Sequence, residues 1–91
     1  MLTPSTTTRF ERDKRKAIEQ KQDLGLLAEI IEKLIKEQPL DSKYCDHPLK
    51  GNWKGFRDCH VKNDWVLIYK VDKEKQRIVF ARLGTHSELF R

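Results

Sequence analysis

Residues 53–83 decide the fold and read WKGFRDCHVKNDWVLIYKVDKEKQRIVFARL. Three segments rich in apolar residues, at about 53–61, 65–71 and 77–83, are separated by two short polar connections. The middle segment is apolar at every position from Trp65 to Tyr69, which is typical of a central strand buried on both faces. Connections this short predict an antiparallel meander of three strands.

A first helix is predicted upstream, from Thr8 to about Lys21. Thr8-Arg9-Phe10-Glu11 fits a capping box, in which a threonine hydroxyl and a glutamate three residues later satisfy each other's backbone amides. The apolar face of this helix is narrow and consists of Phe10, Ala17 and Ile18. Basic residues cover the rest, which indicates either a solvated face or a surface that faces phosphate.

A second helix is predicted over 24–38, capped by Asp23 and ended by Pro39. Its apolar residues recur at steps of three and four, the spacing of one buried stripe. Residues 39–52 are predicted to be a loop. Residues 2–7 tolerate a β conformation, and since Pro4 cannot donate a hydrogen bond, a strand there is expected to lie at a sheet edge or to be short.

These elements predict the α+β class, with a small antiparallel sheet and two N-terminal helices packed on one face. At 91 residues and 10.8 kDa the chain fits one domain, 1–91. No apolar run approaches the roughly 20 residues that span a bilayer, so no membrane association is expected. Two cysteines are too few for a disulfide scaffold, which favours a reduced, cytoplasmic protein.

The net charge of +5 lies mostly in the second half, where residues 46–91 carry ten basic and six acidic residues and all three histidines. A basic surface favours an anionic partner such as nucleic acid. The meander also predicts which polar residues meet. The end of its first strand, the start of its second and the end of its third share one sheet edge, so His60, Asp64, Arg82 and His86 are expected in one neighbourhood.

That group suits RNA cleavage without a metal or other cofactor. Imidazoles can act as base or acid near neutral pH, a carboxylate can orient an imidazole, and a guanidinium can hold phosphate oxygens. Two other interpretations remain open. One is that the histidines are ordinary surface residues, and the other is a zinc site formed by Cys45, His47, Cys59 and His60. The spacing disfavours zinc, because adjacent residues of a strand, such as Cys59 and His60, point to opposite faces.

Three segments in the second half carry a specific pattern: residues 46–61 read DHPLKGNWKGFRDCHV, residues 64–70 read DWVLIYK and residues 82–90 read RLGTHSELF. The first resembles the DHPL-x-G-x-W-x-G-[YF]-R-[DE]-x-H segment of one known family, the YafQ-type toxins of the RelE/ParE superfamily. The other two resemble the blocks that follow in that family in the same order. Residues 1–45 agree with the family only in helical layout.

This resemblance implies a RelE-like fold and a toxin of a type II toxin–antitoxin pair. It implies a ribosome-dependent endoribonuclease that cuts mRNA by attack of the 2′-hydroxyl, inhibits translation, needs no metal and is neutralised by a cognate antitoxin. The expected partners are therefore the antitoxin, the ribosome and mRNA. The alternative is a non-catalytic interaction protein of the same fold that binds an antitoxin or another target; a plain RNA-binding module is third.

The catalytic positions that the resemblance implies are His47, His60, Asp64 and His86, with Arg82 in support. We expect His86 to protonate the leaving 5′-oxygen and Arg82 to stabilise the phosphorane. Either His60 or His47 would serve as base, with Asp64 orienting an imidazole. His47 is placed at the site by the resemblance alone.

Substrate contacts are expected from two aromatic and three basic residues. Trp65 and Phe90 could stack on RNA bases, although Trp65 could equally be packed against the sheet. Lys50, Lys54 and Arg57 are candidate contacts to ribosomal RNA, and a generic solvated role is an equal alternative for each.

Overall fold

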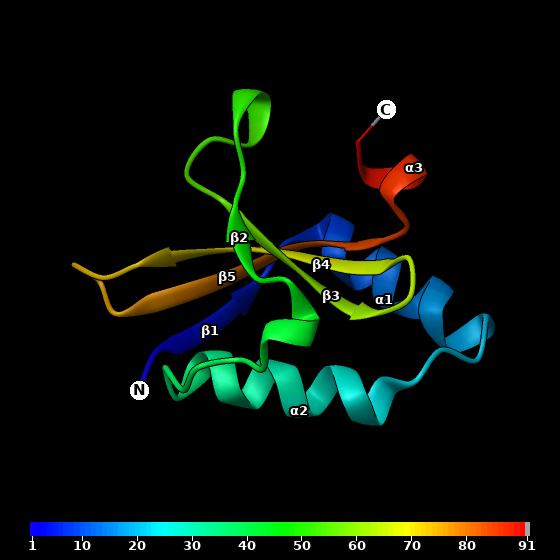
Figure 1. The fold of residues 1–91 in the computed structure, drawn as a ribbon, viewed down its shortest axis with the longest axis horizontal. Helices are drawn as coiled ribbons and strands as arrows, with labels where there is room; N and C mark the ends of the chain where they lie inside the picture. Colours follow the sequence, from blue (N-terminus) through cyan, green and yellow to red (C-terminus); the bar gives the residue numbers. More distant parts are fainter. Residues whose placement is uncertain (91) are drawn as a thin grey trace.

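The computed structural model describes residues 1–90, which form a five-stranded sheet with helices against it (Figure 1). The strand order is β1-β5-β4-β3-β2. The predicted meander is present as β3 (Arg57–Lys62), β4 (Trp65–Asp72) and β5 (Arg77–Gly84), and both of its pairings are antiparallel. The α+β fold predicted from the apolar pattern is therefore confirmed.

Two short strands at the edges complete the sheet. β1 (Thr3–Thr6) pairs in parallel with β5, so the sheet is mixed rather than purely antiparallel as predicted. It lies at an edge, as a strand that contains Pro4 requires. β2 (His47–Pro48) forms the other edge, antiparallel to β3, in a region that we had predicted to be loop.

The N-cap of the first helix, α1 (Thr8–Glu19), lies one residue earlier than predicted. Its N-cap is Thr7, whose hydroxyl oxygen accepts a hydrogen bond from the Phe10 amide, so the predicted capping role of Thr8 is wrong. The Thr7 hydroxyl also donates to the Ala81 carbonyl at 2.7 Å. This second bond ties the start of α1 to β5 and gives Thr7 an advantage that local sequence cannot reveal.

The apolar face of α1 is narrower than predicted. Phe10 and Ala17 are buried, whereas Ile18 is 52% exposed. The helix ends at Glu19 because Lys21 adopts a left-handed conformation (φ 58°) that turns the chain toward the next helix.

The second helix, α2 (Leu24–Ile35), is capped by Asp23 as predicted but ends three residues early. Glu37 adopts a left-handed conformation (φ 58°), which ends the helix in a Schellman-type turn before Pro39. The Leu2 amide donates to the freed Ile35 carbonyl at 2.8 Å, so the N-terminal segment satisfies this helix end.

Two apolar layers lie on opposite faces of the sheet. α1 and α2 share one face and pack on the larger cluster, which includes Cys59, Trp65, Leu67 and Phe80, so the predicted placement of both helices on one face is confirmed. The opposite face carries a smaller cluster of Val66, Ile68, Ala81 and Leu89. In Figure 1, α2 lies on one side of the sheet, while α3 (His86–Leu89) lies on the other.

The segment 49–56 covers part of that second face. We predicted that residues 53–56 begin the first strand of the meander, and this prediction is wrong. It folds back on itself, with the Leu49 amide donating to the Phe56 carbonyl at 2.9 Å and with Gly55 at φ 92°. β3 therefore begins at Arg57 rather than at Trp53. Within residues 1–90, no helix is long and apolar enough to cross a membrane.

Candidate active site

The strand register places the predicted polar residues on the sheet face opposite α1 and α2. His60 pairs with Val66, while Asp58 and Arg82 both pair with Ile68. Directly paired residues project from the same face of a sheet. Since Val66 and Ile68 belong to the smaller cluster, His60, Asp58 and Arg82 share the face that carries α3.

His86 and Asp64 form the tightest contact at this edge. His86 opens α3, a one-turn helix fixed by a reciprocal capping box between Thr85 and Glu88. Its Nδ1 lies 2.5 Å from Asp64 Oδ1, and its backbone amide donates to the same oxygen at 3.2 Å. These two hydrogen bonds lower the pKa of Asp64. The ionised carboxylate accepts a hydrogen bond from Nδ1–H of His86, which leaves Nε2 of the half-exposed imidazole for a substrate.

His60 lies beside this pair. Its ring centroid is 4.9 Å from that of His86, and the two rings meet edge to face. On the other side of His86, the ring of Phe90 lies 5.7 Å away. Within residues 1–90, no hydrogen bond engages the His60 ring nitrogens, so both are open to a ligand.

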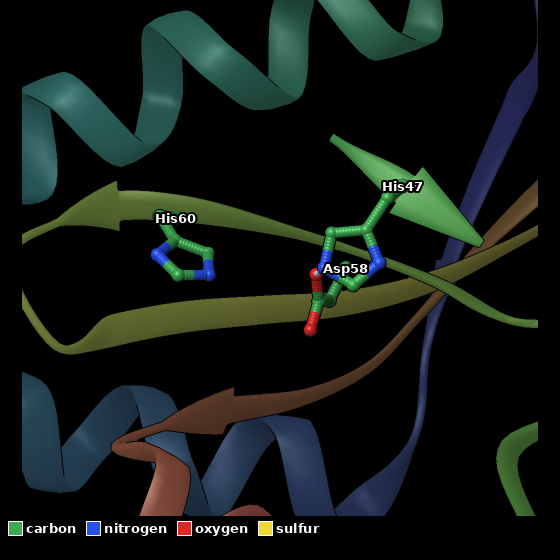
Figure 2. A group of neighbouring side chains, drawn as sticks. All are labelled: His47, Asp58 and His60. Atoms are coloured by element: carbon green, nitrogen blue, oxygen red, sulfur yellow. Dashed lines mark ion pairs between the residues drawn. The ribbon is translucent and has the colours of Figure 1, made fainter. Parts of the chain in front are cut away.

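His47 and Asp58 form a second imidazole–carboxylate pair next to His60 (Figure 2). His47 comes from β2 and Asp58 from β3, and the backbone register sets them directly opposite each other. His47 Nε2 lies 2.8 Å from Asp58 Oδ1, and its Nδ1 lies 3.1 Å from the Pro48 carbonyl oxygen. The His47 ring is half exposed, whereas only 2% of the Asp58 side chain is accessible.

The Asp58 carboxyl is buried, and burial disfavours its charged form. Burial raises the pKa of its carboxyl, and the three nearby histidines, His47, His60 and His86, partly offset this. Its Oδ1 has no hydrogen bond of good geometry within the described chain. Both nitrogens of His47 face acceptors, an arrangement that requires a proton on each nitrogen or a proton on Asp58.

Arg82 does not contact the histidines directly. Its guanidinium donates from Nε and Nη2 to the carboxylate of Asp13 at 2.8 and 3.3 Å, and the Leu83 amide donates to the same carboxylate. Asp13 raises the pKa of Arg82 through its hydrogen bond and charge, although burial opposes this. A guanidinium has five N–H donors, so three remain for a phosphate.

The predicted substrate contacts lie in different places. Trp65 is 4% exposed and packs in the helix-facing cluster, which matches the packing alternative. Arg57 lies on that same face, with its Nε 3.2 Å from Asp46. Lys50 and Lys54 are exposed in the 49–56 segment, and Phe90 is half-buried beside His86.

The ligand atoms of His47, Asp58 and His60 all lie within 4.8 Å of one another and could hold a transition metal ion. This set differs from the zinc alternative considered above. Cys59 is buried in the helix-facing cluster and His60 projects from the opposite face, so they cannot share a metal, as predicted. Cys45 is exposed and has left-handed backbone geometry.

Sequence reasoning missed two carboxylates of this site. Asp58 was not among the predicted site residues, although its spacing of two residues from His60 on one strand was a usable signal for a shared face. Asp13 sits 69 residues before Arg82. Nothing in its local sequence indicates that pairing.

The fold and the site define a class: a small RelE-like α+β protein with two imidazole–carboxylate pairs on the sheet face that its long helices leave open. Comparison with known proteins specifies the family. The family described as "Bacterial toxin of type II toxin-antitoxin system, YafQ" matches residues 2–91. The chain belongs to this YafQ toxin family.

Individual relatives agree with this assignment. The chain is 43% identical over 82 residues to "mRNA interferase toxin YafQ" of Escherichia coli K12, covering 89% of this chain and 87% of the relative. It superposes on the crystal structure of a metal-bound toxin from Helicobacter pylori with a TM-score of 0.93 and 46% identity, over 99% of this chain and all of the other. The E. coli DinJ-YafQ complex gives a TM-score of 0.90 at 37% identity, with full coverage of both chains.

Proposed function

We propose that this protein is an mRNA interferase, an endoribonuclease toxin of a type II toxin–antitoxin pair that cleaves mRNA on the ribosome. The observation that carries the proposal is the contact of His86 with Asp64 at 2.5 Å beside the ring of His60. It supplies two titratable groups within reach of one phosphodiester, as RNA cleavage requires. The name of the E. coli relative, an mRNA interferase toxin, supports the same activity.

The reaction needs one proton removed and one supplied. The 2′-hydroxyl oxygen forms a bond to phosphorus as its proton passes to a base, and the bond from phosphorus to the 5′-oxygen breaks as that oxygen gains a proton. His86 serves as the acid in its imidazolium form: Nδ1–H donates to the Asp64 carboxylate, and Nε2–H gives its proton to the 5′-oxygen. The products are a 2′,3′-cyclic phosphate and a free 5′-hydroxyl, and no metal takes part.

His60 is the better candidate for the base. Both nitrogens of His47 already face acceptors, Asp58 Oδ1 and the Pro48 carbonyl. An imidazole in that arrangement has no lone pair free to take a proton. The ring nitrogens of His60 are open, and His60 lies at 4.9 Å from His86. His47 and Asp58 then lie beside the base, where the half-exposed His47 ring can contact the substrate phosphate.

Arg82 provides the charge that a dianionic phosphorane needs. Its guanidinium projects from the active face, and its bonds to Asp13 fix its direction. The donors that Asp13 does not use are available to phosphate oxygens. A preoriented donor stabilises developing charge without having to reorganise during the reaction.

Two kinds of macromolecule complete the proposal. An antitoxin partner is supported by the DinJ-YafQ complex of E. coli, in which a relative is bound to its antitoxin. The ribosome is proposed because the site is shallow and half exposed, with His47 and His86 each about half accessible. Lys50 and Lys54 on the projecting 49–56 segment are the proposed contacts to ribosomal RNA.

The test is primer extension on a translated mRNA with purified ribosomes. Wild-type protein should give discrete cuts, and His86→Ala should give none. Lys75→Ala, a charge change in the distant β4–β5 turn, is the matched control and should cut like wild type. Cuts by His86→Ala at the wild-type rate would refute His86 as the acid. No cuts by any variant, with antitoxin binding intact, would support the alternative of a non-catalytic interaction protein.

A further inference from the structure

A hollow of about 380 Å³ lies beside Arg82 on the active face of the sheet. Its wall is apolar and includes Trp53, Phe56 and Val79. The rings of Trp53 and Phe56 meet edge to face with centroids 5.2 Å apart, which holds both aromatic side chains in fixed orientations. We call this hollow the base pocket.

Positive charge surrounds the base pocket. Arg9, Lys70 and Arg82 all line it, and none of the residues from 1–90 that line it is acidic. Lys70 Nζ lies 5.4 Å from the centroid of the Phe56 ring, and Arg9 is exposed at the start of α1. An apolar aromatic wall with cations around it matches a nucleotide, whose base stacks on aromatic rings and whose phosphate binds cations.

The base pocket is also within reach of a strand held at the histidines. Ala81 lines the pocket, while Gly84 pairs with Val66 and so lies in the same row as His60. Three residues of a β-strand span about 10 Å. Stacked nucleotides advance about 3.4 Å each, so an RNA a few nucleotides long can occupy both places.

We propose that the base pocket binds the nucleobase of an RNA nucleotide close to the scissile phosphate and so contributes to which sequences are cut. This inference rests on the proposed endoribonuclease function and assigns a substrate site whose aromatic wall lies outside the catalytic group, with Arg82 common to both. An apolar segment of the antitoxin is the competing occupant. The charges of Arg9 and Lys70, the donors of Arg82 that Asp13 does not use, and the absence of acidic residues among the described lining favour the polyanion.

The first experiment observes binding without cleavage. The probe is a hexanucleotide RNA with 2′-O-methyl groups, which lacks the attacking hydroxyl. Its addition should shift the NMR signal of the Trp53 indole N–H and leave that of the buried Trp65 unchanged. Inorganic phosphate alone should cause little shift of either signal. Unmoved Trp53 in RNA-saturated protein would overturn the proposal.

The second experiment fills the base pocket. Val79→Phe places a larger apolar side chain in it, and Val71→Phe does the same in a hollow of about 350 Å³ on the other face of the sheet. Val79→Phe should weaken RNA binding about tenfold, equivalent to about 1.4 kcal/mol, and Val71→Phe should not change it. Circular dichroism and thermal melts establish that both variants fold.

The outcomes separate this inference from the proposed function. Wild-type cleavage with equal RNA binding by both valine variants would refute the base pocket and leave the nuclease in place. RNA binding that shifts Trp53, with no cleavage on ribosomes, would refute the nuclease and keep the pocket. If Val79→Phe weakens antitoxin binding and leaves RNA binding unchanged, the pocket holds the antitoxin and the proposal is wrong.

Discussion

Removal of the Asp13 carboxylate is expected to weaken the packing of α1 against β5 and to destabilise the folded protein. Asp13 lies in the middle of α1 and accepts three hydrogen bonds from β5: two from the Arg82 guanidinium and one from the Leu83 amide. Both charged side chains are about 15% exposed, at 16% for Arg82 and 15% for Asp13. The contact is thus neither a surface ion pair nor a fully buried one.

The size of the effect follows from these three bonds. A hydrogen bond to a charged group contributes about 1.5–3 kcal/mol, but bonds that share one acceptor group are not additive. We expect Asp13→Ala to lower the free energy of unfolding by about 3 kcal/mol, and Asp13→Asn, which keeps one acceptor oxygen, by about 1.5 kcal/mol. For a domain of this size, 3 kcal/mol corresponds to a fall in Tm of about 12–24 °C.

The assay is urea unfolding followed by circular dichroism. Glu19→Ala, at an exposed position of the same helix, should change stability by less than about 0.5 kcal/mol and serves as the control. A double-mutant cycle with Arg82→Met isolates the ion pair and should give a coupling energy of about 1.5 kcal/mol. A coupling below about 0.5 kcal/mol would contradict the view that this pair fixes the guanidinium.

Three further expectations follow from the fold. Thr7→Ala should lower the free energy of unfolding by about 1–2 kcal/mol and Thr8→Ala by far less, because Thr7 is the N-cap; equal losses in urea unfolding would place the cap elsewhere. Burial raises the pKa of the Cys59 thiol to about 12, so a thiol reagent at pH 8 should modify exposed Cys45 quickly and Cys59 only on unfolding; two fast thiols would refute this. His86 lowers the pKa of Asp64 from its ordinary value of 3.8, so the contribution of Asp64 to stability is present above that pH and is lost as the pH falls through the lowered pKa. The free energies of unfolding of wild type and Asp64→Asn should therefore differ at neutral pH and converge in acid. A difference that stays constant with pH would count against the contact.

The apolar pattern was enough to predict most of the sheet and both long helices. β4 could be read from its unbroken apolar run, because a strand buried on both faces allows no other pattern. The errors occur where tertiary contacts decide. Thr7 and Thr8 are equivalent as local caps, and the bond to the Ala81 carbonyl selects Thr7. The early end of α2 depends on the left-handed backbone conformation of Glu37, which cannot be predicted from the residue type because it is unusual for a glutamate.

The candidate site was predictable where strand order alone brings residues together. His60, Asp64 and His86 follow from the meander, since its strand ends share an edge. The position of His47 depends on β2, a two-residue strand too short to leave a periodic signal. The partner of Arg82 is on α1, and the angle at which a helix crosses a sheet is set by side-chain packing that a sequence pattern does not encode.

The parallel pairing of β1 with β5 has a consequence for the order of folding. The meander closes through short turns, whereas Thr3 meets Arg77 across most of the chain, and contacts between such distant residues have a high entropic cost before they form. The meander is therefore the natural nucleus, with β1 docking late. Leu2, the residue before this strand, supplies the amide that satisfies the end of α2, so a single late event closes both the sheet edge and the helix terminus. Backbone amides of β1 should then exchange with solvent through local opening, long before the central strands become accessible.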